Sequence, residues 1–198
     1  LLTAISALDY LGSGYKLRTE LRYRGNMSDS TRIINGNLYC IGCLDPEFSS
    51  LDVNVFADSI KSLNADTIVG NIYADMSFKD NDRLGEGWCW DDDNPILSPL
   101  LISRRNLFVK RFVDELREAG IVVEATLGEA RKPDDAYCIA SRFHSIDQIL
   151  MRMLKESDNL YAESMFYQLA ASTGNRHATA KDAATVIGRL ISKVGLNP

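Results

Sequence analysis

The chain has no excess of basic residues and no long apolar run, and each of these absences excludes a class of protein. Lys and Arg number 22 against 27 Asp and Glu, so the formal net charge of the 198 residues is −5. A basic face for phosphate backbones is not expected, and we predict no nucleic-acid partner. No apolar run reaches the roughly 18–20 residues of a membrane-spanning helix, so no integral membrane segment is predicted. The hydrophobic share of 45% still suffices for one or two compact domains.

Histidine and cysteine are also too scarce to predict a metal centre. The two histidines, His144 and His177, are far apart in the sequence, and no second pair of ligands accompanies the C-x-x-C of Cys40 and Cys43. A structural zinc site needs four ligands, and a thioredoxin-like redox pair opens a helix. Here the cysteines follow an apolar run and precede a proline turn, so we expect packing thiols or a local disulfide. No metal and no cofactor are predicted.

Hydrophobic periodicity predicts a mixture of helices and strands. Strands are predicted at residues 15–24, 37–41, 67–73, 121–127 and 137–143, with a turn region bracketed by Gly25 and Gly36. Helices are predicted at 1–11, 52–63, 106–119 and 145–155, after 157–159, and from Thr179 onward. This order predicts an α+β fold of two parts. An inserted β-rich module would span 14–100, and 1–13 and 101–198 would belong to a helical part.

Ser157-Asp158-Asn159 lies between two of the most periodic helical segments. Ser, Asp and Asn are preferred helix N-caps, so the tripeptide alone is compatible with a simple helix start. In serine enzymes that act on D-alanyl peptides and penicillins, however, a Ser-Asp-Asn loop between helices is one of three catalytic elements. The other two are Ser-x-x-Lys, which carries the nucleophile, and Lys-Thr-Gly. The chain contains no Lys-Thr-Gly.

Five stretches of the chain match a single family in that family's own order. They are LLTAISALDYLGSGY (1–15), GNLYCIGCLDPEF (36–48), GEGWCWDDD (85–93), SIDQILMRMLKESDNLYAESMFYQLA (145–170) and GLNP (195–198). Together they resemble the D-alanyl-D-alanine carboxypeptidase/endopeptidase family, the class C low-molecular-mass penicillin-binding proteins. The resemblance implies part of a penicillin-binding-protein/β-lactamase-like transpeptidase fold, with the Ser-Asp-Asn tripeptide in its catalytic loop.

The resemblance also implies a chemistry and a set of site residues. The expected enzyme is a serine-type D-Ala-D-Ala carboxypeptidase or endopeptidase that acts on peptidoglycan stem peptides through an acyl-enzyme. It would bind β-lactam antibiotics and work in the periplasm, or otherwise outside the cytoplasm, of a bacterium. Ser157 and Asn159 would be catalytic, the first as a proton relay and the second as a hydrogen-bond partner of the substrate amide. Asp158 would support the loop, and Trp88 and Asp91 would bind the side chain of the peptide stem.

Three departures from the family pattern follow from the same alignment of motifs. The family's Ser-x-x-Lys would precede Leu1 and its Lys-Thr-Gly would follow Pro198, so we expect this chain alone to be inactive. The connection over residues 95–106 is shorter than in the family, which usually carries an extra small domain there. The literal Ser-x-x-Lys from Ser13 to Lys16 runs into an alternating strand, where side chains at i and i+3 point to opposite faces. Ser13 is therefore not expected to be the nucleophile.

Two interpretations from other classes stay open at this point. A pseudoenzyme would keep the fold and bind peptidoglycan or a partner protein without catalysis, and its upstream Ser-x-x-Lys would be replaced. A cytoplasmic redox protein would instead depend on reactive thiols at Cys40 and Cys43. Trp88 also has a second interpretation, as part of a surface turn whose indoles cover the core.

Overall fold

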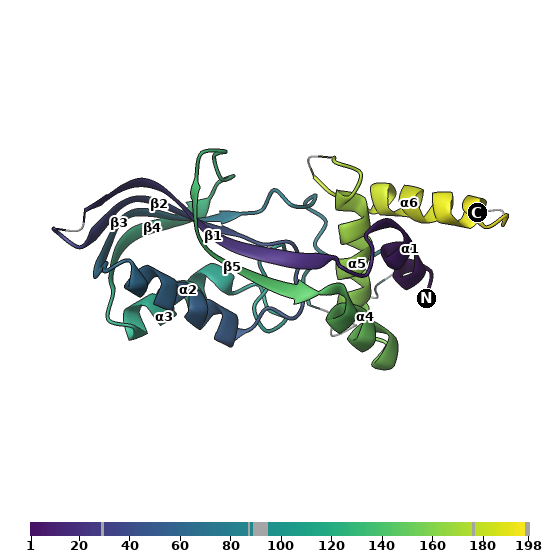
Figure 1. The fold of residues 1–198 in the computed structure, drawn as a ribbon, viewed down its shortest axis with the longest axis horizontal. Helices are drawn as coiled ribbons and strands as arrows, with labels where there is room; N and C mark the ends of the chain where they lie inside the picture. The colour runs from purple at the N-terminus through teal and green to yellow at the C-terminus, as the bar shows by residue number, and fades with distance from the viewer. Residues whose placement is uncertain (29, 87, 89–94, 176, 197–198) are drawn as a thin grey trace.

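The computed structural model describes residues 1–28, 30–86, 88, 95–175 and 177–196 (Figure 1). Each helix and strand predicted from periodicity is present within one or a few residues of its predicted bounds, apart from the β1–β2 hairpin described below. In chain order the elements are α1 (Leu2–Tyr10), β1 (Lys16–Ser28), β2 (Ile33–Ile41), α2 (Ser50–Ser62), β3 (Thr67–Asp75), α3 (Phe108–Glu118), β4 (Val122–Glu129), β5 (Tyr137–Ser145), α4 (Ile146–Lys155), α5 (Asn159–Ala171) and α6 (Ala180–Lys193).

The strands form one five-stranded mixed sheet in the order β4-β3-β2-β1-β5. β2, β3 and β4 run parallel, whereas β1 is antiparallel to both of its neighbours. α2 and α3 connect the parallel strands and both cover the same face of the sheet (Figure 1). The mixed α/β architecture predicted from the sequence is confirmed. The sheet includes strands from both sides of the boundary predicted at residue 100, and that division into domains stays a prediction.

The turn between β1 and β2 lies inside the region predicted between Gly25 and Gly36 but is shorter, because both strands continue through the glycines and pair them. Gly36 in turn pairs with Gly70 of β3, so three glycines form a row across the sheet. A Cβ on Gly36 would lie 2.5 Å from the Arg24 carbonyl oxygen, and one on Gly70 would lie even closer to the Gly36 carbonyl oxygen. The glycines therefore permit a close backbone approach and do not mark a turn.

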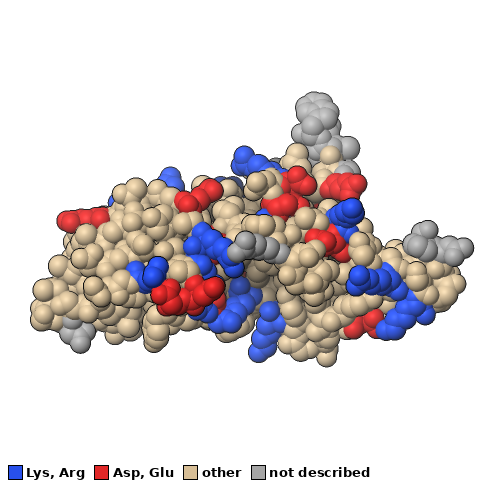
Figure 2. All heavy atoms as spheres, turned by 90° about the horizontal axis from the view of Figure 1, so that it is seen from above, with Lys and Arg blue, Asp and Glu red and all other residues tan. Residues whose placement is uncertain are grey.

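The connection from β4 to β5 has to cross the sheet, because these strands form opposite edges. Arg22 of β1 donates to the Ala136 carbonyl over 3.0 Å, and Arg24 pairs with Asp135 over 3.2 Å. Arg22 also pairs with Glu20 over 3.0 Å. The contacts of Arg22 with Ala136 and of Arg24 with Asp135 hold the crossing segment against β1. On the face seen in Figure 2, basic and acidic side chains are interspersed over the middle of the molecule.

The buried hydrophobic side chains of the described residues form two clusters. One packs α2 and α3 against the sheet, with Phe48, Phe56 and Phe108 in mutual ring contact at centroid distances of 4.9–6.2 Å. The other joins α1, α4, α5 and α6. In Figure 1 the sheet and its two helices lie at one end of the molecule and the second group of helices at the other. No described helix is long and apolar enough to cross a membrane.

Cys40 and Cys43 are both free thiols, so the alternative of a local disulfide is wrong and the packing interpretation is confirmed. Cys40 is fully buried in the sheet cluster. Burial raises the pKa of both thiols far above the usual range, and the negative charge of Asp45 adds to the effect at Cys43. Thiols held protonated in this way are poor nucleophiles and poor metal ligands. Within the described residues, no group of three or more metal-ligating side chains is arranged to hold an ion.

Candidate functional site

Ser157 and Asp158 lie in the short connection between α4 and α5, and Asn159 is the first residue of α5, so the tripeptide lies between two helices as predicted. α4 starts with a capping box, in which Ser145 and Gln148 exchange hydrogen bonds of 2.8 and 3.3 Å. At its end, Ser157 adopts the left-handed conformation with φ +53°. Gly usually occupies this position, because a side chain there costs about 1–2 kcal/mol. A strained serine in an exposed helix connection is the kind of outlier that is often found at functional sites.

Asp158 is the N-cap of α5 and is held by charge on its other side. Its Oδ1 accepts from the Leu160 amide over 3.1 Å, and its Oδ2 accepts from Arg104 over 2.5 Å, with Arg152 3.6 Å away. Partial burial opposes ionisation, but the hydrogen bond and charge of Arg104 outweigh it and hold the pKa of Asp158 below its usual range. The carboxylate is therefore held in its charged form. The role of Asp158 as a support of the site stays a prediction.

The loop opens on a cavity of about 200 Å³ that it shares with the beginning of the chain. Ser157 and Asn159 are exposed and line this cavity together with Leu1 and Thr3 of the first turn of α1. Its remaining walls are Met153, Leu154, Asp158 and Ala162. The hydroxyl of Ser157 and the amide of Asn159, both able to form hydrogen bonds, thus line the same cavity as the N-terminal end of α1.

α5 is fixed in place by polar side chains on one of its faces. Tyr161, Ser164 and Gln168 follow the i, i+3, i+7 spacing of one helical face and all contact the segment after β2. Tyr161 donates to Glu47 over 2.7 Å, Ser164 to the Leu44 carbonyl over 2.7 Å and Gln168 to the Cys43 carbonyl over 2.6 Å. This attachment ties the helix that carries the loop to the sheet.

Sequence reasoning missed this attachment. The only available signal was a polar stripe, Tyr161, Ser164 and Gln168, in a helix that also carries Asn159 and Glu163. Such a stripe normally indicates the solvent face of a helix. Here these side chains are buried, because α5 is packed on all sides.

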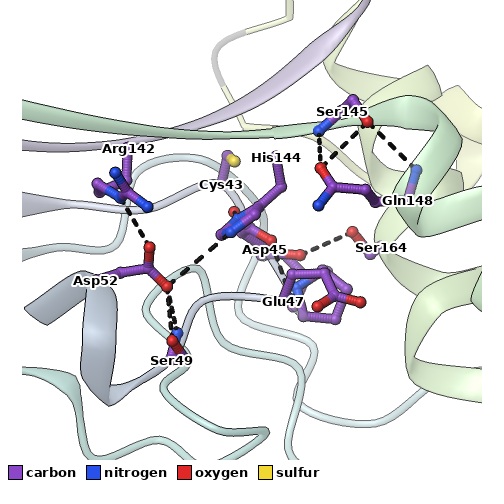
Figure 3. A network of polar contacts seen from close by, with 12 residues as sticks. Cys43, Asp45, Glu47, Ser49, Asp52, Arg142, His144, Ser145, Gln148 and Ser164 are labelled. Carbon is purple, nitrogen blue, oxygen red and sulfur yellow. Dashed lines mark hydrogen bonds and ion pairs between the residues drawn. The ribbon is translucent and has the colours of Figure 1, made fainter.

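The segment after β2 is itself held by a charged network (Figure 3). His144 of β5 contacts Asp45 through Nδ1 over 2.7 Å, and its Nε2 lies 4.0 Å from Asp52 of α2. Asp52 also accepts from Arg142 over 2.7 Å and from the Ser49 amide over 2.9 Å. The hydrogen bond to Asp45 raises the pKa of His144 against the effect of burial, and the nearby carboxylates add to this. Both ring nitrogens thus face carboxylates, and neither faces a serine.

Comparison with known proteins assigns the chain to a family. A model of the D-Ala-D-Ala carboxypeptidase 3 (S13) family matches residues 1–101 and 97–197. The chain belongs to the S13 family. A D-alanyl-D-alanine carboxypeptidase of Actinomadura sp. (strain R39) is 32% identical over 101 residues, which is 48% of this chain and 17% of that protein.

Solved structures of similar fold cover nearly the whole chain. Penicillin binding protein 4 of Haemophilus influenzae superimposes with a TM-score of 0.89 at 17% identity over 98% of this chain and 61% of that one. The same protein crystallised with a β-lactam gives a TM-score of 0.76 at 17% identity over 98% and 59%. These likenesses confirm the predicted penicillin-binding-protein fold. This S13-family chain thus spans less than two thirds of the length of these relatives.

The remaining candidates of this S13-family chain are Trp88, Asp91 and Ser13. Trp88 is half-buried and packs against the helical cluster, next to Glu163 of α5. A Cβ on Gly85 would lie 2.6 Å from both the Trp88 ring and Glu163 Oε1. Asp91 lies outside the described residues. Ser13 is in an exposed turn, and Lys16 begins β1. The roles of Trp88 and Asp91 in binding the peptide stem stay predictions.

Proposed function

We propose that this chain is part of a serine-type D-Ala-D-Ala carboxypeptidase or endopeptidase that cleaves peptidoglycan stem peptides and is acylated by β-lactams. The observation that carries the proposal is the cavity shared by Ser157, Asn159 and the first turn of α1. By family resemblance, a Ser-x-x-Lys segment directly precedes that turn. A nucleophilic serine and its lysine would then open onto the same hollow as the two loop side chains.

The proposed reaction is acyl transfer in two steps. The serine hydroxyl attacks the carbonyl of the terminal D-Ala-D-Ala bond while the neutral lysine takes its proton. Ser157 passes a proton from the lysine to the departing D-alanine amine, and the Asn159 amide hydrogen-bonds the substrate and the lysine. Water then attacks the acyl-enzyme and releases the shortened peptide as a carboxylic acid. Asp158 takes no part in proton transfer, since its carboxylate is already engaged on both oxygens.

Two finer elements complete the proposal. Trp88 and Asp91 would hold the stem side chain, the indole against its aliphatic part and the carboxylate on a free amine.

A peptidase that acts on peptidoglycan works outside the cytoplasm, so we also propose a periplasmic or other extracytoplasmic location in a bacterium.

Acylation by labelled penicillin tests the proposal. We expect the full native polypeptide to gain a covalent adduct at a serine upstream of Leu1, with intact mass and peptide mapping as the readout. The 198-residue chain, run beside it, should gain none, because Ser13, its only serine with a lysine three residues later, lies in a turn before a strand. An adduct on the short chain would contradict this assignment. If neither folded form reacts, the non-catalytic binding module replaces the enzyme.

A further inference from the structure

Arg104 reaches the Ser-Asp-Asn loop from the tip of a tight turn. Ile102 and Arg105 exchange backbone hydrogen bonds of 2.8 and 2.9 Å, and the two residues between them both have positive φ, +45° at Ser103 and +66° at Arg104. This is the geometry of a type I′ turn, which strongly favours Asn-Gly. Ser-Arg occupies it here, so the conformation is maintained by its surroundings and not by local preference.

The turn is anchored at its base, which gives its tip a defined direction. Ile102 is buried in the sheet cluster, and the Ser103 amide donates to the Phe48 carbonyl over 2.8 Å. The guanidinium of Arg104 therefore comes from the sheet part of the molecule and meets Asp158 of the helical part. These two residues are 54 positions apart in the sequence.

Asp158 has three partners, one backbone amide and two arginines, and Arg104 is the nearer of the arginines. The α5 amide of Leu160 donates to one carboxylate oxygen, and Arg104 donates to the other. Arg152 is farther from that oxygen and lies over the Tyr161 ring at 4.9 Å. Removing Arg104 would leave a largely buried carboxylate whose remaining cation is Arg152, at the longer distance of 3.6 Å. Because Ser157 and Asn159 flank Asp158 directly, a shift of this carboxylate displaces both side chains.

We propose that Arg104 is a positioning residue that clamps Asp158 and thereby holds Ser157 and Asn159 in the geometry needed for acylation. The inference rests on the proposed function. It also gives the short connection over residues 95–106 a role, since this connection ends in the turn that presents Arg104. The two stretches matched by the family model meet at residues 97–101, within this same connection.

The clamp is tested first in the 198-residue chain, without any activity. The carboxyl of Asp158 is titrated by carbon NMR in the unaltered chain and in Arg104→Ala, Arg104→Lys, Arg152→Ala and Arg105→Ala. We expect Arg104→Ala to move the titration midpoint upward most, Arg104→Lys and Arg152→Ala to move it less, and Arg105→Ala to leave it unchanged. Arg105 is the matched control, because it is an exposed arginine of the same turn. An unchanged midpoint in Arg104→Ala would overturn the clamp.

The positioning role is tested next by penicillin acylation in the full native polypeptide. A misplacement of about 1 Å can cost about 10²-fold in rate, so we expect Arg104→Ala to lower the limiting acylation rate constant by about 10–100-fold. The dissociation constant of the initial complex should change little. Arg104→Lys should recover part of the rate, and Arg105→Ala should match the unaltered enzyme. If Arg104→Ala fails to fold, Arg104→Lys and Asp158→Asn carry the comparison.

Failure of this inference is distinguishable from failure of the proposed function. If Ser157→Ala slows acylation but Arg104→Ala does not, the positioning role is overturned and the enzyme assignment stands. If the folded unaltered polypeptide is never acylated, the proposed function is overturned and the positioning role with it. A rate loss that is equal in Arg104→Ala and Arg105→Ala would reflect the turn as a whole and would overturn the clamp.

Discussion

At the scale of single residues, the Ser-Asp-Asn loop combines local strain with charged support. Ser157 occupies a left-handed position where glycine is favoured, and Asp158 is engaged on both carboxylate oxygens. Stability alone would favour glycine at position 157, so we predict that the hydroxyl of Ser157 is kept for function.

The first residue-scale prediction separates stability from function at Ser157. Ser157→Gly relieves the left-handed strain, so we expect the free energy of unfolding of the chain to rise by about 0.5–1 kcal/mol in urea titrations. In the full native polypeptide the same substitution removes the proposed proton relay and should slow penicillin acylation by about 10²-fold.

Ser157→Ala is the matched control for this experiment. It removes the hydroxyl and keeps the strain, so it should slow acylation to a similar extent without stabilising the chain. Faster or unchanged acylation in Ser157→Gly would show that the Ser157 hydroxyl takes no part in acylation.

At the scale of elements, the sequence patterns locate the helices and strands well and misjudge the glycines. Alternation along β1 and the helix caps at Ser145 and Thr179 are local signals, and the structure confirms them. Glycine in a sequence most often marks a turn, which is what Gly25 and Gly36 predict by themselves. Their real role depends on which strands pair, and pairing is not a local property.

The glycine row yields an element-scale prediction. In Gly36→Ala the new Cβ would meet the Arg24 carbonyl oxygen and the Cα of Gly25, both on the neighbouring strand β1 and within 3 Å. We expect a loss of about 1–3 kcal/mol in the free energy of unfolding, the usual cost of overpacking, as measured by urea denaturation.

Gly188→Ala is the control for this prediction, since Gly188 lies in α6 and nothing lies within 4 Å of the position that its Cβ would take. Alanine there should stabilise the chain by about 0.5–1 kcal/mol through helix propensity. A change of the same sign in the free energy of unfolding of both variants would contradict the close approach of the strands at Gly36.

At the scale of the whole molecule, the sheet part and the helical part are joined by a few polar contacts. The segment after β2 bonds α5, the network of His144, Asp45 and Asp52 holds that segment, and Arg104 bonds Asp158. Charged groups with shifted pKa values therefore lie where the two parts meet. The stability of the fold should depend on pH through them.

The whole-molecule prediction concerns His144. Its pKa is raised in the folded protein, so the protonated imidazole stabilises the fold fully below its unfolded pKa of about 6.5. This contribution is lost as pH rises from there through the folded pKa. We expect urea unfolding curves of the chain to show declining stability over that window, relative to His144→Gln, in which the dependence should be flatter.

The acidic side of the same profile has the opposite sign. The pKa values of Asp52 and Asp158 are lowered in the fold, so their contribution is present above their unfolded pKa of about 4 and is lost as pH falls below it.

Equal pH profiles for the unaltered chain and His144→Gln above about pH 6.5 would show that the imidazole is not coupled to folding.

The sequence by itself determined the local elements, the family and the residues of the loop. Periodicity, caps and short motifs act over a few residues, and the backbone geometry that they require is set by those residues alone. Only the tertiary structure decided the sheet order, the glycine row, the attachment of α5 through Tyr161, Ser164 and Gln168, and the pairing of Arg104 with Asp158. These contacts join groups that are distant along the chain, and the sequence around each group does not indicate which partner it contacts.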